Sequence, residues 1–292
     1  MSDSNLRTEL GEVGPRTSEH VLDAAPIRAL AALFDDELPC PGLGDALPPL
    51  WHWVALAEWL PTSTTGPDGH PRPGDLPPAL RGKRRMFAGG RVDFHAQLHV
   101  GDRVRREDEL VRIESKSGRH GEFLLVESRT RLYGERGDLA VDERRDLVYR
   151  DATDSNASPA AAVLPASSSS APRLLAKVDG QWLFRTDSVM LMRFSSATSN
   201  GHRIHFDWPY ATQVEGYPGL VVHGPLMTLA LVEVLRLEGS TSGVRSVIHR
   251  NTRPLFCGEA AEVRHEDPSR AAAGDVTLRR GGEVHSSLSM RF

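Results

Sequence analysis

Features that identify disulfide-stabilised, membrane-spanning or nucleic-acid-binding proteins are scarce in this sequence. Cys40 and Cys257 are its only cysteines, and two thiols so far apart exclude a disulfide framework and a cluster of thiolate metal ligands. The longest apolar runs, such as residues 226–235, are too short to span a bilayer, and the polar first residues lack the apolar core of a signal peptide. A net charge of -4 gives no general attraction to nucleic acid or anionic lipid. We therefore expect a cytoplasmic protein with no nucleic-acid or membrane partner.

One low-complexity segment divides the chain. Residues 151–172 consist mainly of alanine, serine and proline, which cannot build a core, so this segment is expected to be a linker. Residues 1–150 and 173–292 lie on either side, and each part is long enough to form a domain. With 39% hydrophobic and 25% charged residues, the chain has the composition of a globular protein.

The two parts share a faint repeat. Pro41-Gly42-Leu43 and Pro218-Gly219-Leu220 are each followed, seven residues after the first proline, by a second proline and an apolar run. Farther along, residues 96–103 are similar to residues 253–260, because both end an apolar segment with glycine and an acidic residue. The pattern indicates two similar units that pack as a pseudo-dimer.

The second part has the clearest secondary-structure pattern. Gly224-Pro225 precedes a run that is apolar on nearly every side and Gly239 follows it, which predicts a buried helix. Strand-like segments follow at residues 244–249, 260–265, 275–279 and 284–292. The first part repeats this order, with an apolar run at residues 50–60 expected to form its helix and strand-like segments at residues 108–115, 122–133 and 140–150. One buried helix followed by antiparallel strands, twice, predicts an α+β fold.

Polar side chains are concentrated in residues 194–210, shortly before the predicted second helix. They are Asn200, His202, Arg203, His205, Asp207 and Tyr210, and His223 follows at the start of the helix. Each histidine taken singly would be an ordinary loop residue, but their clustering favours a functional site. A buried helix N-terminus offers unpaired N–H groups and partial positive charge, so the backbone N–H of Gly224 suits a developing enolate oxygen. A nearby histidine, with an ordinary pKa of about 6.5, can move the proton of a water molecule.

The segment FSSATSNGHRIHFDWPYA, with GLVVHGPL after it, resembles the signature of MaoC-like enoyl-CoA hydratases. The match is to the two-part branch that contains mesaconyl-C4-CoA (3-methylfumaryl-CoA) hydratases and type 2 hydroxyacyl-thioester dehydratases. The first part resembles the same branch at residues 51–53, 67–71, 84–90, 116–121 and 143–150. The resemblance covers nearly the whole chain except the linker. It implies a double hot-dog fold, in which each half wraps an antiparallel sheet around one helix, and the hydration or dehydration of an acyl-CoA thioester.

Carried over residue by residue, the resemblance places the catalytic histidine at His205 and the oxyanion donor at the backbone N–H of Gly224. The family pattern has an aspartate five residues before the histidine, where this chain has Asn200. An amide cannot accept a proton as a carboxylate does, so His205 is the expected acid/base and Asn200 the residue that positions water. An aspartate would repel a substrate carboxylate by about 4 kcal/mol at about 4 Å in a medium with a dielectric constant of about 20. Asn200 therefore favours a short, branched dicarboxylic acyl group such as that of mesaconyl-C4-CoA.

A negatively charged substrate needs cationic partners. We assign substrate binding to Arg84, Arg85 and Arg203, together with Tyr210 and His223. The first part carries no NxxxxH signature, so it is predicted to be a degenerate hot-dog that shapes the acyl or CoA tunnel. Acyl-CoA is the predicted partner, and the sequence leaves open whether two copies form a homodimer.

Three other functions compete with hydration. His202, His205 and Asp207 imitate a two-histidine, one-carboxylate metal set, but three ligands within six residues are cramped, and no metal is predicted. A hot-dog thioesterase would attack the carbonyl carbon instead, whereas Asn200 and the His205 signature favour hydration. A protein that binds acyl thioesters without turnover is the third alternative. No GxSxG elbow, P-loop or dinucleotide fingerprint is present, so no cofactor is expected.

Overall fold

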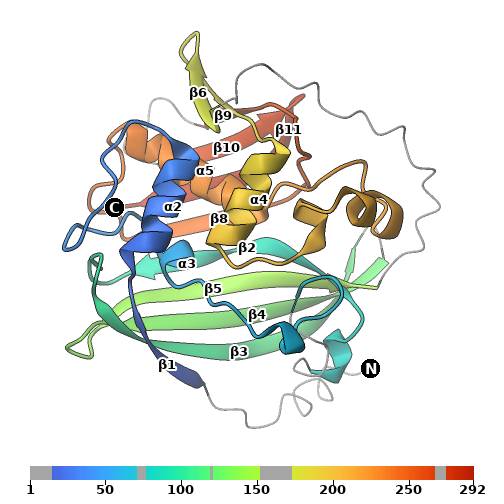
Figure 1. Cartoon of the computed structure of the whole chain (residues 1–292), viewed down its shortest axis with the longest axis horizontal. Coiled ribbons are helices and arrows are strands. Elements are labelled where there is room, and N and C mark those ends of the chain that lie inside the picture. Colours follow the sequence, from blue (N-terminus) through green and yellow to red (C-terminus); the bar gives the residue numbers. More distant parts are fainter. Residues whose placement is uncertain (1–14, 71–76, 119–120, 152–172, 267–273) are drawn as a thin grey trace.

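The computed structural model describes residues 15–70, 77–118, 121–151, 173–266 and 274–292. The predicted linker at residues 151–172 therefore lies outside the described residues, apart from Asp151. The described elements form an α+β arrangement, as predicted, with the helices gathered on one face of a broad antiparallel sheet (Figure 1). None of the described helices is long and apolar enough to cross a membrane.

The described strands form a single sheet in the order β1-β3-β4-β5-β2-β8-β11-β10-β9-β7-β6. In the first half they are β1 (Arg16–Val21), β2 (Arg84–Phe94), β3 (Arg103–Gly118), β4 (Gly121–Tyr133) and β5 (Leu139–Arg150). In the second half they are β6 (Leu175–Val178), β7 (Gln181–Phe184), β8 (Ser246–Asn251), β9 (Ala261–His265), β10 (Gly274–Arg280) and β11 (Glu283–Arg291). Burial alternates along them: Leu288 and Met290 of β11 are buried, and Ser289 between them is less so. This period of two is expected of an antiparallel sheet with one covered face.

The two halves of the sheet have the same strand order. β1-β3-β4-β5-β2 in the first half corresponds to β7-β9-β10-β11-β8 in the second, and β2 pairs with β8 to join them. The joint is tight, because a Cβ atom on Gly89 would lie 2.3 Å from the carbonyl oxygen of His249. Glycine is therefore required where the two backbones approach.

Two isolated bridges define the register of the repeat. Ala46 lies opposite His99 in the first half, and Val221 lies opposite Phe256 in the second. The predicted correspondence of residues 96–103 with residues 253–260 agrees with these bridges. The predicted correspondence of the two Pro-Gly-Leu segments is wrong by two residues, because it pairs Val221 with Gly44 instead of Ala46.

α5 (Gly224–Leu237) is the central helix of the second half, and its prediction is confirmed. Every residue from Leu226 to Leu235 is buried, and the helix packs on β8, β10, β11 and β2. Full burial of one leucine side chain contributes about 1.5–3 kcal/mol, so this helix is a large part of the core. Its N-terminus is thereby held at a fixed place, next to the joint between the halves.

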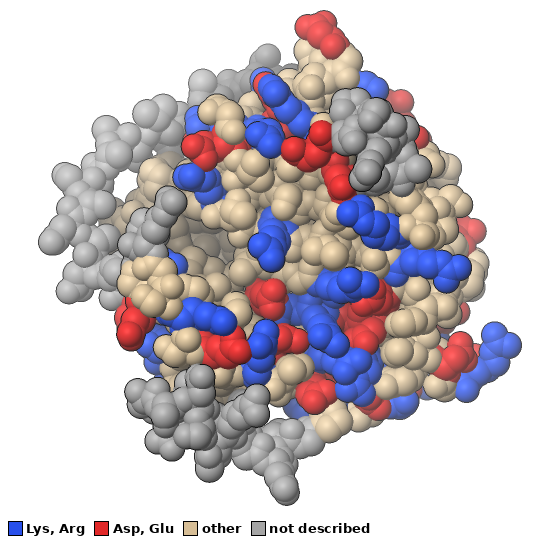
Figure 2. All heavy atoms as spheres, turned by 180° about the vertical axis from the view of Figure 1, so that it is seen from behind, with Lys and Arg blue, Asp and Glu red and all other residues tan. Residues whose placement is uncertain are grey.

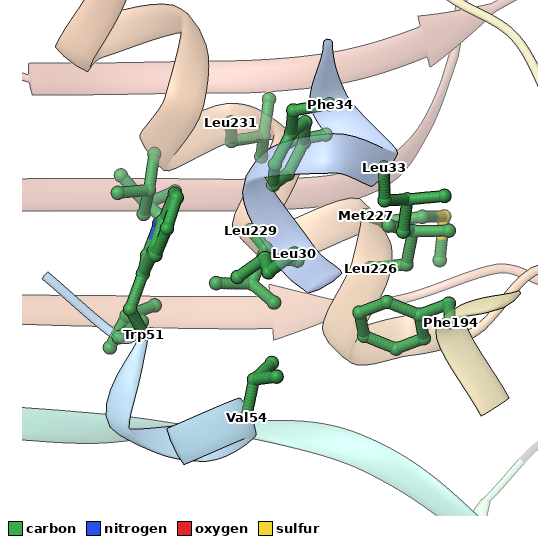
Figure 3. Packing of buried hydrophobic residues seen from close by; sticks show 14 of the residues in the cluster. Leu30, Leu33, Phe34, Trp51, Val54, Phe194, Leu226, Met227, Leu229 and Leu231 are labelled. Atoms are coloured by element: carbon green, nitrogen blue, oxygen red, sulfur yellow. The ribbon is translucent and has the colours of Figure 1, made fainter. Parts of the chain in front are cut away.

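α2 (Ala24–Phe34) and α4 (Ser188–Ala197) occupy equivalent places in the two halves and pack against each other. Each begins at an aspartate cap: Asp23 accepts a hydrogen bond from the N–H of Ala25, and Asp187 from that of Met190. Figure 3 shows side chains of α2 and α5 gathered with Trp51 in one core. The core is thus shared between the halves.

The apolar run at residues 50–60 does not form the long helix expected of the first half. Only α3 (His52–Ala55) is helical, and Trp59 and Leu60 beyond it are exposed. The rings of His52 and Trp53 lie 3.0 Å and 2.9 Å from the carboxylate of the buried Glu143, which fixes this single turn on the sheet. A loop therefore takes the place of the first-half helix and runs toward the second half.

The reverse face of the molecule carries charges of both signs. Figure 2 shows lysine and arginine side chains interspersed with aspartate and glutamate. On the first-half strands these charges form ion pairs such as Arg129 with Asp142 and Arg131 with Glu109.

Candidate active site

The polar segment lies between α4 and α5, at the N-terminal end of the buried helix. After α4 the chain forms a 3-10 turn at Arg203–His205 and a π-helical turn at Tyr210–Val214. The N–H of Val221 donates to the carbonyl of Ile204 at 3.0 Å, which fastens the segment beside the strand that leads into α5. The local fold therefore brings the predicted histidine and the predicted oxyanion donor to one place.

His205 is buried and its tautomer is set by a backbone carbonyl. Its Nδ1 lies 2.7 Å from the carbonyl oxygen of Val221, and since a carbonyl only accepts, Nδ1 carries the hydrogen. Nε2 is left with a free lone pair. Burial is the main cause that lowers the pKa of His205 to about 4, so the ring is neutral at neutral pH.

His223 lies directly against His205. The two rings are stacked, with their centroids 3.6 Å apart, and Nε2 of His223 is 2.9 Å from Oγ of Ser195. Burial lowers the pKa of His223 well below its ordinary value, so it packs as a neutral ring. Within the described part of the chain its Nδ1 has no hydrogen-bond partner. His223 thus fixes the plane of His205 from one side.

Gly224 is the first residue of α5, and its lack of a side chain lets Phe87 and Asn251 pack close to the helix N-terminus. A Cβ atom there would lie 3.1 Å from Phe87 and 3.4 Å from the side chain of Asn251. Pro225 follows in the first turn, where its missing N–H has no intrahelical partner. The backbone at Gly224 can therefore be approached more closely than any other residue would permit.

A cleft of about 730 Å³ lies in front of this helix terminus and is built by both halves. Its wall contains Trp53, Arg85, His70, Phe87 and Arg145 from the first half, and Phe194, Ser195, Asn200, Gly201 and Pro225 from the second. Asn200 is held there by its N–H, which donates to Ser195, and by its Oδ1, which accepts from the N–H of His202. His205 and Gly224 lie behind this wall and are absent from the cleft lining. Asn200 thus faces the cleft and is bonded to His202, three residues before His205.

A loop of the first half packs over the catalytic segment. The N–H of Arg203 donates to the carbonyl of Asp68 at 3.0 Å, and its guanidinium donates to the carbonyl of Pro67. Gly69 faces Gly201 so closely that a Cβ atom on Gly69 would lie 1.7 Å from the Gly201 carbonyl oxygen. The loop is therefore fitted to this segment, which sequence reasoning noted only as a family mark at residues 67–71.

Three donor side chains meet where the loop touches the segment. The ligand atoms of Asp68, His70 and His202 all lie within 4.8 Å of one another. Asp68 and His70 already bond to each other, with His70 Nδ1 3.2 Å from Asp68 Oδ2, so this pair is held together by its own hydrogen bond. The set weighed from the sequence differs: Asp207 binds Arg203, and Nδ1 of His205 binds Val221. The prediction of no metal stays a prediction.

The predicted cationic residues differ in what they contact. Arg84 pairs with Glu215 at 2.8 Å, and Arg203 pairs with Asp207 and lies over the ring of Tyr210. Arg85 lines the cleft and forms no ion pair with any residue that the structure describes. Arg85 is therefore the predicted cation that is available to a ligand.

Arg145 is a second cation in the cleft wall, and it lies in the segment 143–150 that was noted only for its family resemblance. It lies on β5 on the same face as Leu147, and its guanidinium pairs with the buried carboxylate of Glu143. His52 and Trp53 also bond to Glu143. They hold the carboxylate in place, and the carboxylate in turn holds the guanidinium of Arg145. The strand register places Arg145 opposite Gly90 and Arg85 opposite Tyr149, and both side chains line the same cleft.

Comparison with known proteins agrees with this architecture. Residues 50–257 match the family "Hydroxyacyl-thioester dehydratase type 2". The chain is 35% identical over 280 residues to the mesaconyl-C(4)-CoA hydratase of Chloroflexus aurantiacus, covering 91% of this chain and 96% of that protein. It is 27% identical to the mitochondrial type 2 hydroxyacyl-thioester dehydratase of Schizosaccharomyces pombe, over 74% of this chain and 77% of that protein.

Solved structures with low sequence identity share the fold. HtdX of Mycobacterium tuberculosis aligns with a TM-score of 0.62 at 18% identity, over 94% of this chain and 98% of that chain. A MaoC-like dehydratase of Phytophthora capsici aligns with a TM-score of 0.63 at 16% identity, over 98% of both chains. The predicted double hot-dog fold is confirmed.

Proposed function

The chain belongs to the family of type 2 hydroxyacyl-thioester dehydratases, and we propose that it adds water reversibly to the α,β-double bond of an acyl-CoA thioester. It is accordingly a hydro-lyase. The acyl group that we propose is short, branched and dicarboxylic, as in mesaconyl-C4-CoA, on which the relative from Chloroflexus aurantiacus acts by its name. The free thiols of Cys40 and Cys257 support a cytoplasmic location.

The observation that carries this proposal is the joint placement of His205 and Gly224 by one backbone segment. Val221 accepts from Nδ1 of His205, and three residues later Gly224 begins α5. In this mechanism Nε2 of His205 takes a proton from water, and the amide of Asn200 orients that water. The backbone N–H of Gly224 stabilises the thioester enolate, a contribution typically worth about 10²–10³ in rate.

A carboxylate on the acyl group is supported by the charges of the cleft. Arg85 and Arg145 place two cations in its wall, and Arg85 has no carboxylate partner in the described part of the chain. Asn200 is neutral where an aspartate would repel an anionic substrate. The cleft therefore favours a negatively charged acyl group over a plain hydrocarbon one.

The test is a comparison of wild type and His205→Ala on mesaconyl-C4-CoA and on crotonyl-CoA. Loss of the enoyl-thioester absorbance and release of free thiol are followed in parallel. We expect the wild type to remove the absorbance without thiol release and to prefer mesaconyl-C4-CoA. Because general acid–base catalysis contributes about 10²–10⁴, the variant should lose at least about a hundredfold in kcat.

The control is His265→Ala, a partly exposed histidine of β9 that pairs with Glu238 outside the cleft lining. It should leave both rates unchanged. Thiol release by the wild type would replace hydration with thioester hydrolysis. A preference for crotonyl-CoA would refute the dicarboxylic acyl group and leave hydration intact.

A further inference from the structure

The replacement of aspartate by Asn200 leaves the hydration reaction short of one proton carrier. Addition of water moves two protons: one leaves the attacking water, and one arrives at Cα of the thioester. His205 can accept the first, whereas the amide of Asn200 can neither accept nor deliver the second at neutral pH. A second titratable group at the cleft is therefore needed.

We propose that His70, oriented by Asp68, is this second proton-transfer group. His70 belongs to the first half and lines the same cleft as Asn200, Gly201 and Pro225. It lies beside the catalytic segment, with its ring centroid 4.1 Å from that of His202. The inference rests on the proposed hydration and names a catalytic residue that the NxxxxH segment does not contain.

The hydrogen bond to Asp68 gives His70 the tautomer that the role requires. Nδ1 of His70 lies 3.2 Å from Oδ2 of Asp68, and the N–H of His70 donates to Oδ1 of the same carboxylate. The hydrogen bond from His70 is the main cause that lowers the pKa of Asp68 to about 2, so the carboxylate is charged at neutral pH. Because a carboxylate only accepts, Nδ1 of His70 carries a hydrogen, and Nε2 is the nitrogen that exchanges protons.

The loop that carries His70 is held rigidly against the segment that it serves. Its backbone accepts hydrogen bonds from Arg203 at two carbonyls, and Gly69 contacts Gly201 without room for a side chain. Catalytic groups need such fixed geometry, because small displacements cost large factors in rate.

The neighbours of His70 include acidic and basic side chains. Asp68 faces it from its own loop, His202 and His205 lie on the catalytic segment, and Arg85 of β2 lines the same cleft. His202 is buried and neutral, since burial lowers its pKa to about 2. Arg84, Tyr210 and Glu215 line a neighbouring pocket with His70, and Glu215 pairs with Arg84. Asp68 is the carboxylate that bonds to His70.

The proposed step balances as follows. The oxygen of water bonds to Cβ while its proton passes to Nε2 of His205, and the π electrons move to the thioester oxygen at the N–H of Gly224. The enolate then collapses, and Cα takes the proton from Nε2 of the His70 imidazolium. His70 ends neutral and His205 protonated, and exchange with solvent restores both. In dehydration neutral His70 removes the α-proton.

The test uses the full chain with His70→Gln, His70→Ala and Asp68→Asn, and His265→Gln as the control. We expect His70→Gln to lower kcat by about 10²–10³ while KM stays within about threefold, because general acid–base catalysis is lost and binding is kept. Exchange of the product α-hydrogen with deuterated solvent should fall in parallel. Free imidazole should restore part of the activity of His70→Ala, which a structural role would not produce. Asp68→Asn should lower kcat less than His70→Gln does, because the ring loses the partner that orients it but keeps its Nε2.

Several outcomes would overturn the proposal. One is turnover by His70→Gln at the wild-type rate. Another is a rise in the KM of His70→Gln as large as its fall in kcat, together with no rescue of His70→Ala by imidazole. A wild-type activity that EDTA removes and a divalent cation restores would make Asp68, His70 and His202 metal ligands instead. Thermal melting checks that each variant folds, and the glutamine variant serves if the alanine variant does not. Failure of the wild type to hydrate any acyl-CoA would refute the proposed function itself, which these variants do not test.

Discussion

Arg145 tests substrate choice at a side chain that also pairs with the buried Glu143. Replacement of Arg145 by glutamine removes one charge-assisted hydrogen bond to a substrate carboxylate, a loss of about 1.5–3 kcal/mol. We therefore expect kcat/KM for mesaconyl-C4-CoA to fall by about 10–100-fold, mainly through KM. Crotonyl-CoA, which carries no such carboxylate, should be hydrated at the wild-type rate. Steady-state kinetics with both substrates measure the difference.

Arg144→Gln is the matched control for this prediction. Arg144 is the neighbour of Arg145 on β5, is 57% exposed and lies outside the cleft lining. Its replacement should change neither substrate. An equal loss on both substrates for Arg145→Gln would show that Arg145 supports the fold and does not recognise the acyl group.

The sequence could indicate the residues of the site that are close together in the chain. Asn200, His205 and Gly224 were singled out because one polar segment precedes one buried helix, and the structure does place them at that helix N-terminus. Arg145 and His70 lie far away in the sequence. They lie in segments noted only for family resemblance, and their position beside Asn200 depends on tertiary contacts such as that of Gly69 with Gly201.

The loop at residues 66–70 holds His70 beside the polar segment. In Gly69→Ala the new Cβ would clash with the carbonyl of Gly201, and a φ of +88° adds the strain of a left-handed backbone. The loop must move, so His70 leaves its place and kcat should fall by at least about tenfold. Gly137→Ala separates the two causes, because Gly137 has a φ of +82° and nothing within 4 Å of its Cβ position. Gly137→Ala should lose only stability, about 1 kcal/mol, and keep full activity. Equal kcat values for the two variants would contradict the proposed close contact of the loop with Gly201.

The junction between α2 and α5 predicts a pH-dependent stability. Glu233 of α5 is fully buried and shares the guanidinium of Arg236 with Asp36, which follows α2. Burial is the main cause that raises the pKa of Glu233 to about 8 from its ordinary 4.5. The folded protein thus binds the carboxyl proton of Glu233 more tightly than the unfolded chain does. The stability that this proton contributes to the fold is fully present below pH 4.5 and is lost as the pH rises through about 8.

Glu233→Gln removes this titration and keeps the shape of the side chain. The melting temperature of the variant minus that of the wild type should therefore increase between pH 5 and pH 9. Each pKa unit corresponds to about 1.4 kcal/mol, and 1 kcal/mol shifts the melting temperature of a protein of this size by about 2–4 °C. An increase of several degrees is expected. A difference that stays constant over this range would show that Glu233 is ionised in the fold at all these pH values.

Helices were predicted well where one sequence signal and one packing environment agree. Gly224-Pro225 and the apolar run behind it predict α5, and the sheet buries it. The run at residues 50–60 has a similar composition, yet only His52–Ala55 is helical. There the buried Glu143 binds two side chains of the first turn, and the chain beyond it leaves the core. Such tertiary contacts override local helix preference, which contributes only a few tenths of a kcal/mol per residue.

At the scale of the whole molecule, the two halves share one sheet and build one cleft. The sheet is continuous through β2 and β8, and α2 packs on α4 across the halves. The cleft takes His70, Arg85 and Arg145 from the first half and Asn200 and Pro225 from the second. Strand order in each half is the same, but the functions have separated: the second half holds the NxxxxH segment and the central helix, and the first supplies the opposite wall.

This division predicts the behaviour of a chain that is cut between residues 151 and 173. The second half alone should lose at least about a hundredfold in activity, because it lacks the first-half groups of the cleft. Its β8 would also become an unpaired edge strand, which favours aggregation. Co-expressed halves should associate through β2 and β8 and recover turnover that depends on protein concentration, since the linker no longer keeps the two together. Co-elution in size-exclusion chromatography and hydration assays at several dilutions measure both effects. If the second half alone hydrated the substrate at the wild-type rate, the first half would be dispensable, and both the Arg145 and the His70 assignments would fail with it.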